Sequence, residues 1–216
     1  MNLKPKISRA VALPQGELNW TDRVREYAEF FAAWVRRPRQ TASVVPSSRF
    51  LARLMVRDID PAGGRVLELG GGTGVFTRAI LGKGLPASRL EVVEINSMFA
   101  RGLERQFPGV DVIQHRAESI SAHVSGTPGG YQAVVSGLPL LAINQETQRE
   151  ILREAFSLLA PGGVFVQFTY SVLPPVSREV LQSLGLVATR AGQTVRNFPP
   201  ATVFHFRRAT TALPGA

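Results

Sequence analysis

The sequence is poor in cysteine, lysine and long apolar runs. None of its 216 residues is cysteine, which excludes disulfide bonds and thiolate metal sites. No apolar run approaches the ~20 residues that span a bilayer, and residues 1–20 lack the apolar core of a secretory signal. Lysine occurs only at Lys4, Lys6 and Lys83. We therefore expect a cytoplasmic protein without disulfide bonds.

Positive charge is nevertheless abundant, and arginine supplies nearly all of it. The chain has 25 basic and 16 acidic residues, which gives a net charge of +9. Residues 1–50 hold nine of the basic residues and four of the acidic ones, so the excess is concentrated there. Arginine binds phosphate oxygens through a planar fork of donors, so an anionic partner is one explanation. Biased codon usage in a GC-rich genome is the other explanation for the abundance of arginine.

Strand and helix patterns alternate from Arg65 onward. Strands are expected at 65–69, 89–95, 110–115, 131–139 and 164–170, helices at 75–84, 97–107, 144–160 and 176–185, and two antiparallel strands at 186–197 and 202–208. This alternation predicts an α/β fold with a seven-stranded, mostly parallel sheet that is covered on both faces. We expect this domain to occupy residues 51–208, after an N-terminal helical extension at 1–50 and before a disordered tail at 209–216.

The most informative motif is the turn VLELGGGTGVF, residues 66–76, which joins the first strand to the first helix. Its alternate glycines are Gly70, Gly72 and Gly74. The dinucleotide fingerprint G-x-G-x-x-G would need a further glycine where the chain has Val75. Glu68 precedes the glycines and suits a ligand with an ammonium group better than a pyrophosphate.

A second acidic residue, Glu94, ends the second strand about 20 residues after the turn, where a carboxylate accepts hydrogen bonds from ribose hydroxyls. Glu68, the glycines and Glu94 together resemble motif I and the acidic loop of class I S-adenosylmethionine-dependent methyltransferases. The resemblance implies a Rossmann-like methyltransferase sandwich, with S-adenosylmethionine as cofactor and S-adenosylhomocysteine as product. It also implies that Glu68 serves the methionine end of the cofactor and Glu94 the ribose.

The stretch HRAES, residues 115–119, follows the third strand, where this family contacts the adenine with an acidic and then a small residue. Ala117 fits the small position. Arg116 occupies the acidic position and cannot accept a hydrogen bond from the adenine amine. We expect Glu118 to substitute, so Ala117 and Glu118 form the adenine end of the predicted cofactor site.

The fourth strand ends in SGLPL, residues 136–140. Amino-methylating relatives place a polar side chain and backbone carbonyls against the attacking nitrogen here, so Ser136 is expected to contact both cofactor and acceptor. Nucleobase-modifying members carry Asn or Asp first and, after the proline, an aromatic residue that stacks on the extruded base. The chain has Ser136 and Leu140 instead, which disfavours a nucleobase acceptor. A plain strand-to-loop turn is the alternative interpretation.

An aromatic-rich segment precedes the domain. Between residues 20 and 35, apolar residues recur at helical spacing. This spacing predicts an amphipathic helix, whose apolar side carries the aromatic residues Trp20, Tyr27, Phe31 and Trp34. Arg36 and Arg37 follow, and this composition suits the interface of an anionic membrane. Ordinary packing on the sheet, or closure over the cofactor as a lid, are the other interpretations of this helix.

Five stretches taken together resemble the bacterial phosphatidylethanolamine N-methyltransferases across residues 27–208. They are residues 30–55, 66–81, 134–141, 164–171 and 196–208. This resemblance implies stepwise methylation of phosphatidylethanolamine toward phosphatidylcholine. It also implies peripheral attachment to anionic lipid at the inner face of the cell membrane, through the aromatic helix. Neither nucleic acid nor an obligate protein partner is expected.

The acceptor is expected to meet residues from both ends of the chain. Tyr170 follows the fifth strand, at the rim where such sheets bind ligands, and is our first candidate for contact with the amine. Tyr27 and Trp34 offer aromatic faces to a methylated cation. Arg196, Arg207 and Arg208 are candidate ligands for the lipid phosphate, and solvated strand ends are the other interpretation. The expected catalytic contacts are thus Tyr170, Ser136 and Tyr27. The three histidines have no metal-ligand spacing, so no metal is expected.

Two other functions fit the sequence. One is an RNA amine methyltransferase similar to the rRNA adenine dimethylases, for which the charge of +9 is equally good support. The other is a non-catalytic module that binds S-adenosylmethionine and uses the aromatic helix as a partner site.

Overall fold

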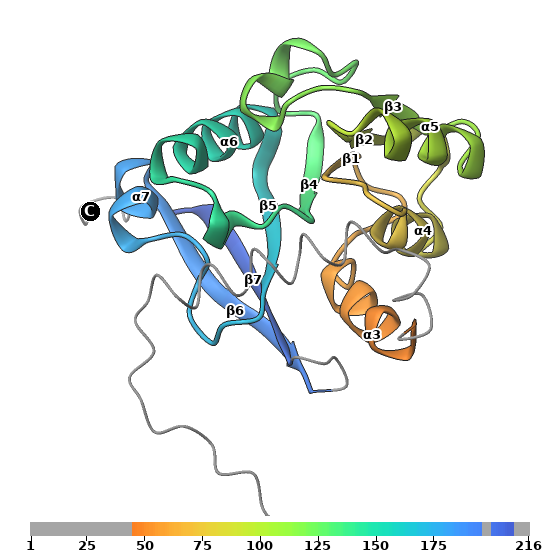
Figure 1. The fold of residues 1–216 in the computed structure, drawn as a ribbon. Coiled ribbons are helices and arrows are strands. Elements are labelled where there is room, and N and C mark those ends of the chain that lie inside the picture. Colours follow the sequence, from red (N-terminus) through yellow and green to blue (C-terminus); the bar gives the residue numbers. More distant parts are fainter. Residues whose placement is uncertain (1–44, 196–199, 210–216) are drawn as a thin grey trace, which may run out of the picture.

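The computed structural model describes residues 45–195 and 200–209 (Figure 1). The predicted aromatic helix at 20–35, with Trp20, Tyr27, Phe31 and Trp34, lies outside these ranges. So do Arg36, Arg37, Arg196 and residues 210–216 of the predicted tail. Their expected roles therefore stay predictions.

A single sheet of seven strands forms the centre of the described chain (Figure 1). The strands are β1 Arg65–Leu69, β2 Leu90–Val93, β3 Asp111–Ile113, β4 Tyr131–Ser136, β5 Leu159–Thr169, β6 Leu186–Thr194 and β7 Ala201–Arg208. Their order is β3-β2-β1-β4-β5-β7-β6, with β1 to β5 parallel and β7 antiparallel to both of its neighbours. The seven-stranded, mostly parallel α/β sandwich expected from the sequence is confirmed.

Helices cover both faces of this sheet (Figure 1). They are α3 Val45–Met55, α4 Val75–Gly82, α5 Ser97–Gln106, α6 Gln145–Leu158 and α7 Arg178–Ser183, with short 3₁₀ turns η2 Ala87–Arg89, η3 Ala117–Ala122 and η4 Leu140–Ala142. Residues of α6, α7 and η3 pack on one face, and residues of α3, α4 and α5 pack on the other. The two apolar clusters arise because successive residues of a buried strand point to opposite faces.

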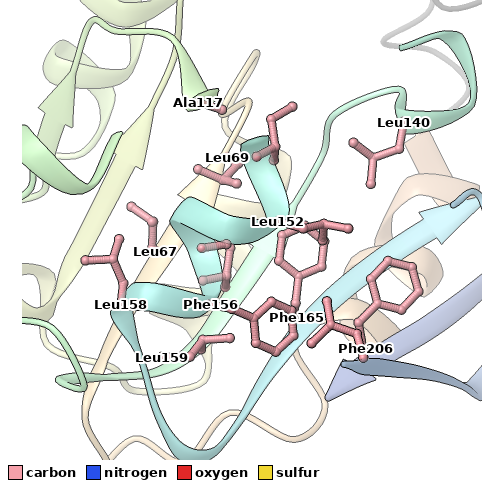
Figure 2. Packing of buried hydrophobic residues seen from close by; sticks show 14 of the residues in the cluster. Leu67, Leu69, Ala117, Leu140, Leu152, Phe156, Leu158, Leu159, Phe165 and Phe206 are labelled. Carbon is pink, nitrogen blue, oxygen red and sulfur yellow. The ribbon is translucent and has the colours of Figure 1, made fainter. Parts of the chain in front are cut away.

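Aromatic stacking fixes β5 between α6 and β7 (Figure 2). The Phe165 ring of β5 lies 5.7 Å from the Phe206 ring, with the planes only 1° apart, and 6.4 Å from the Phe156 ring of α6. The Asn144 side chain caps α6 by accepting the Thr147 N–H at 2.9 Å. The ring contacts pack the middle of β5 against α6 and β7, and Tyr170 follows the carboxyl end of this strand.

Helix α3 belongs to the sheet domain. Leu51 and Met55 are buried against the face that also holds α4 and α5. The domain boundary expected between residues 50 and 51 falls inside this one continuous helix. No structural break therefore separates the two residues.

The strand order reverses direction between β1 and β4, which lie side by side at the centre of the sheet. In sheets of this kind, the crevice outside the carboxyl ends of such a strand pair is the usual ligand site. The glycine turn follows β1 and the SGLPL turn follows β4, so both motifs lie at this place.

Candidate active site

In the glycine turn after β1, one glycine is tightly packed and another has free space beside it. A Cβ on Gly74 would lie 2.4 Å from the Phe107 ring, so the turn packs closely on the end of α5. At Gly72, by contrast, no described atom lies within 4 Å of that position. Both residues have positive φ, of 80° and 52°, which glycine adopts without steric cost. Gly72 is therefore the point at which a ligand can touch the backbone.

Glu94 connects the end of β2 to this open glycine. Its Oε2 accepts the Gly72 N–H at 2.8 Å, and its Oε1 accepts the Asn96 N–H at 2.8 Å. The two carboxylate oxygens offer about four lone-pair sites, so ribose hydroxyls can still donate to them. The structure places Glu94 beside Gly72, where a ribose-binding carboxylate fits.

Glu68 lies beneath the turn and is fully buried. The Thr77 hydroxyl of α4 donates to its Oε2 at 2.7 Å, whereas Oε1 has no hydrogen-bond partner among the described residues. Burial raises the pKa of this carboxyl group to about 8, and the Thr77 hydrogen bond opposes that rise. A buried acceptor without a donor fits a cationic ligand group, which is what the sequence predicted for Glu68.

At the adenine end, the structure brings Arg116 and Glu118 together. Their side chains form an ion pair of 3.1 Å, in which Glu118 is the less exposed partner. One Glu118 oxygen is therefore already occupied by the guanidinium group. Ala117 is buried at the start of η3. The other carboxylate oxygen of Glu118 is therefore the one that we expect to accept a hydrogen bond from the adenine.

Two exposed apolar residues next to Glu94 escaped the sequence analysis. Ile95 is 59% exposed and Met98 is 61% exposed, which is high for large apolar side chains. Asn96 caps α5 between them by accepting the Met98 and Phe99 N–H groups. We expect the flat cofactor base to cover this pair. The signal in the sequence was the apolar residue directly after Glu94.

The SGLPL turn is held by hydrogen bonds from both neighbouring strands. Gly137 N donates to the Leu69 carbonyl of β1 at 2.8 Å, and Gln167 Nε2 of β5 donates to the Leu138 carbonyl at 3.0 Å. The Ser136 hydroxyl oxygen accepts the Leu138 N–H at 3.3 Å and is fully buried. In this structure Ser136 shapes the turn and does not line the hollow beside it. Gln167 was not singled out by the sequence.

A small apolar hollow that opens to solvent lies at the carboxyl ends of β4 and β5. Its lining consists of Leu138, Pro139, Leu140, Leu141, Ala142, Phe168, Thr169, Tyr170 and Pro175. None of these side chains is charged. Tyr170 thus stands where the sequence placed it, at the rim of the sheet beside the SGLPL turn.

An aromatic row connects the glycine turn to this hollow. Phe76, in the first turn of α4, meets Phe168 edge to face with ring centroids 5.8 Å apart. Phe168 meets Tyr170 in the same way at 5.5 Å. The row joins the cofactor side to the acceptor side through three rings. Phe76 and Phe168 were not predicted, because only the fold brings α4 against β5.

The phosphate-binding role expected of Arg207 and Arg208 is wrong. Strand β7 runs antiparallel to β5, so it carries these residues toward the amino end of β5, away from the hollow. There Arg207 Nη1 donates to the Gly162 carbonyl, and Arg208 Nη2 donates to the Phe156 carbonyl at 2.8 Å. Both arginines therefore support the opposite end of the sheet.

The histidines also lie apart from the hollow. His205 Nε2 is 3.5 Å from Asp58 Oδ2, and the centroids of the His115 and His123 rings are 3.6 Å apart, with the planes tilted by 30°. Within residues 45–195 and 200–209, no group of three or more His, Cys, Asp or Glu residues could hold a metal ion. In the same ranges, no helix is long and apolar enough to cross a membrane.

Comparison with known proteins places these features in a family. A family model described as a methyltransferase domain matches residues 66–163. The chain is 32% identical over 190 residues to an ornithine lipid N-methyltransferase of Singulisphaera acidiphila, an alignment that covers 85% of this chain and 97% of that protein. It is 30% identical over 119 residues to the ribosomal RNA small subunit methyltransferase C of Chromohalobacter salexigens, covering 53% of this chain and 34% of that protein.

A solved structure supports the fold. The 1,6-didemethyltoxoflavin-N1-methyltransferase of Burkholderia thailandensis, crystallised with S-adenosylhomocysteine, superposes with a TM-score of 0.60 at 14% identity. The superposition covers 94% of this chain and 93% of that one.

Proposed function

The chain belongs to the class I S-adenosylmethionine-dependent methyltransferases, and we propose that it methylates the primary amine of a membrane lipid headgroup. S-Adenosylmethionine is its cofactor. The observation that carries the proposal is the lining of the hollow beside the SGLPL turn, which contains no charged side chain. An amine attached to apolar chains suits such a lining, whereas a polyanionic acceptor would need cations there.

Two headgroups carry the required amine. Phosphatidylethanolamine is the acceptor implied by the resemblance of the five stretches to its methyltransferases. An ornithine lipid is supported by the relative from Singulisphaera acidiphila, which aligns over nearly its whole length. Both are primary alkylamines on a zwitterionic headgroup, so one site chemistry serves either. The anion differs, being a phosphate diester in one lipid and a carboxylate in the other.

The residues of the chain have three tasks in the reaction. The bound cofactor supplies a methyl group on a positively charged sulfur. Glu68, Gly72 and Glu94 would hold this cofactor, which would supply the methyl group to the deprotonated lipid amine and keep the electron pair of the broken C–S bond on its sulfur. The SGLPL turn and Tyr170 orient the nitrogen, and the Phe76–Phe168–Tyr170 row excludes water. The methylated ammonium product then loses a proton to solvent before the next transfer.

The site of action in this proposal is the inner face of the cell membrane. The net charge of +9 favours an anionic surface, and the aromatic segment at 20–35 is proposed to provide the attachment. Neither nucleic acid nor an obligate protein partner is part of the proposal.

RNA is the alternative acceptor, and the partial likeness to an rRNA methyltransferase supports it. At residue 140, however, the ring that would stack on a flipped base is replaced by a buried leucine.

The test is to incubate the purified protein with labelled S-adenosylmethionine and one of three acceptors: vesicles with phosphatidylethanolamine, vesicles with ornithine lipid, or total RNA. We expect label in the lipid of one vesicle type. Label in RNA alone would overturn the proposal.

A further inference from the structure

The loop between β5 and α7 presents two large apolar side chains to solvent. Val172 is 67% exposed and Leu173 is 58% exposed. Adjacent apolar residues at such exposure are uncommon on a described domain whose other apolar residues are largely buried. On the other side of the loop, Pro175 lines the acceptor hollow and Val176 is buried. The loop is therefore anchored in the domain and turns only its tip outward.

Local hydrogen bonds hold this tip in one shape. The Thr169 hydroxyl accepts the Ser171 N–H at 3.1 Å, and the Ser171 hydroxyl accepts the Leu173 N–H at 3.1 Å. Such side-chain turns replace the hydrogen bonds that the loop backbone would otherwise seek in water. These hydrogen bonds form a defined turn next to Tyr170, and this turn exposes Val172 and Leu173 to solvent.

We propose that the Val172–Leu173 tip enters the apolar edge of a lipid bilayer and so seats the acceptor hollow on the membrane surface. This inference rests on the proposed lipid acceptor. Figure 1 shows the loop after β5 at the carboxyl end of the parallel strands, the end at which the hollow lies. A headgroup that enters the hollow leaves its acyl chains at the mouth, beside this tip.

The distribution of charge favours a bilayer as the occupant. Residues 119–145 and 155–177, which supply most of the hollow's lining and the whole tip, contain no Asp, Glu, Lys or Arg. No charged group of these stretches would have to leave water when the rim meets lipid, so a large desolvation cost is avoided. The first charged residue after the tip is the exposed Arg178, and the whole chain carries +9, which complements an anionic surface.

The size of the tip limits its role to orientation. Two side chains bury less apolar surface than one myristoyl chain, which by itself gives only marginal and reversible membrane binding. The tip therefore cannot hold the protein on the membrane alone. It fixes which face of the protein meets the lipid, while attachment needs a second contact.

The experiment uses the absence of cysteine from the natural chain. Leu173→Cys in the full chain is labelled with an environment-sensitive fluorophore and mixed with vesicles of phosphatidylethanolamine and phosphatidylglycerol. The matched control is Val187→Cys, a 45% exposed apolar residue that pairs with Arg207 at the opposite end of the sheet. We expect a blue shift, with quenching by lipids labelled in their acyl chains, at position 173 and not at 187.

A second variant measures the contribution to binding. Val172→Ser with Leu173→Ser should lower vesicle partitioning about tenfold, or about 1.4 kcal/mol, while a Val187→Ser control keeps it. Methylation of a monomeric short-chain aminolipid should stay unchanged in both. Methylation of vesicle lipid should fall in the first variant only.

The outcomes separate this inference from the proposed function. A probe at 173 that stays aqueous while vesicle aminolipid is methylated overturns the inference and leaves the function standing. A probe that enters the bilayer while no aminolipid is methylated supports membrane contact by the tip and overturns the proposed function. A probe shielded before vesicles are added, and unchanged by them, means that protein covers the tip and overturns the inference.

Discussion

The Thr77 hydroxyl group donates a hydrogen bond of 2.7 Å to one oxygen of the fully buried Glu68 carboxyl group, and the other oxygen has no donor among the described residues. This relationship joins the first turn of α4 to the end of β1, directly beneath the glycine turn. It leaves one place in the site where a cationic group of the cofactor completes an unfinished hydrogen-bond set.

Glu68→Gln should change the protonation linked to cofactor binding. The Glu68 pKa of about 8 means that the wild-type carboxyl group is mostly protonated at pH 7, and an ammonium group beside it favours the ionised form. Binding of S-adenosylhomocysteine at pH 7 should therefore release up to one proton in the wild type and fewer in the variant. Calorimetry in two buffers of different ionisation enthalpy measures this. Equal proton release in both proteins would contradict the expected role of Glu68.

The same group makes the unliganded protein less stable as pH rises. Glu68 holds its proton in the folded state up to pH about 8 but loses it near pH 4.5 when unfolded. Between these values the folded state binds more protons, so the stability contribution is full below pH 4.5 and is lost toward pH 8, by up to about 1.4 kcal/mol per pH unit. Denaturant unfolding of wild type and Glu68→Gln across this range should show this additional downward slope in the wild type only.

Thr77→Val should destabilise the domain by about 1–3 kcal/mol, because the buried Glu68 group then loses its side-chain donor. Thr77→Ser keeps a hydroxyl group at the same place and should retain most of the stability. Urea unfolding compares the two. If the valine variant is as stable as the serine variant, the hydrogen bond contributes nothing.

Glu94→Ala should weaken cofactor binding by about tenfold or more, since it removes both the expected ribose acceptor and the partner of the Gly72 N–H. Glu146→Ala removes an exposed carboxylate that pairs with Arg149 on α6 and serves as the matched acidic control. Titration with S-adenosylhomocysteine gives both affinities. An equal loss of affinity in the two variants would contradict the ribose-binding role expected of Glu94.

Tyr170 variants should separate the ring from its hydroxyl group. Tyr170→Phe keeps an aromatic face for the methylated ammonium, whereas Tyr170→Ala removes it. We expect the alanine variant to lose most in the later methylations, because their ammonium products carry more methyl groups and are less well hydrated. Product distributions by thin-layer separation report this. If phenylalanine and alanine are equally impaired, the hydroxyl group is the part that matters.

Arg65→Met should cost about 3 kcal/mol of stability. Arg65 Nε donates at 2.8 Å to Glu91, which is fully buried and also accepts the Tyr131 hydroxyl at 2.8 Å. The exposed pair Arg149–Glu146 is the control, and Arg149→Met should cost less than about 1 kcal/mol. Thermal unfolding compares them. Equal losses would mean that the Glu91 carboxyl group is not held by its arginine.

Much of the cofactor side could be predicted because its signals are local. Glu68 lies near the carboxyl end of β1, the glycines follow β1 and Glu94 follows β2. The parallel strands of such a sheet bring their carboxyl ends to one edge. Local patterns could not reveal Phe76 beside Phe168, or Gln167 holding Leu138, because these pairs are far apart in the chain. The error at Arg207 and Arg208 has the same origin, since only the direction of β7 decides which end of the sheet they reach.

The sequence by itself determined the α/β sandwich and the order of its motifs, because periodicity and glycine spacing act over a few residues. Tertiary structure decided that Glu68 is buried with one oxygen unpaired, and that an uncharged hollow adjoins Tyr170. It also decided that the apolar tip at Val172 and Leu173 lies beside that hollow. The burial of Glu68 and the contacts around the hollow depend on how β1, β4 and β5 pack together. No single stretch of the chain contains that information.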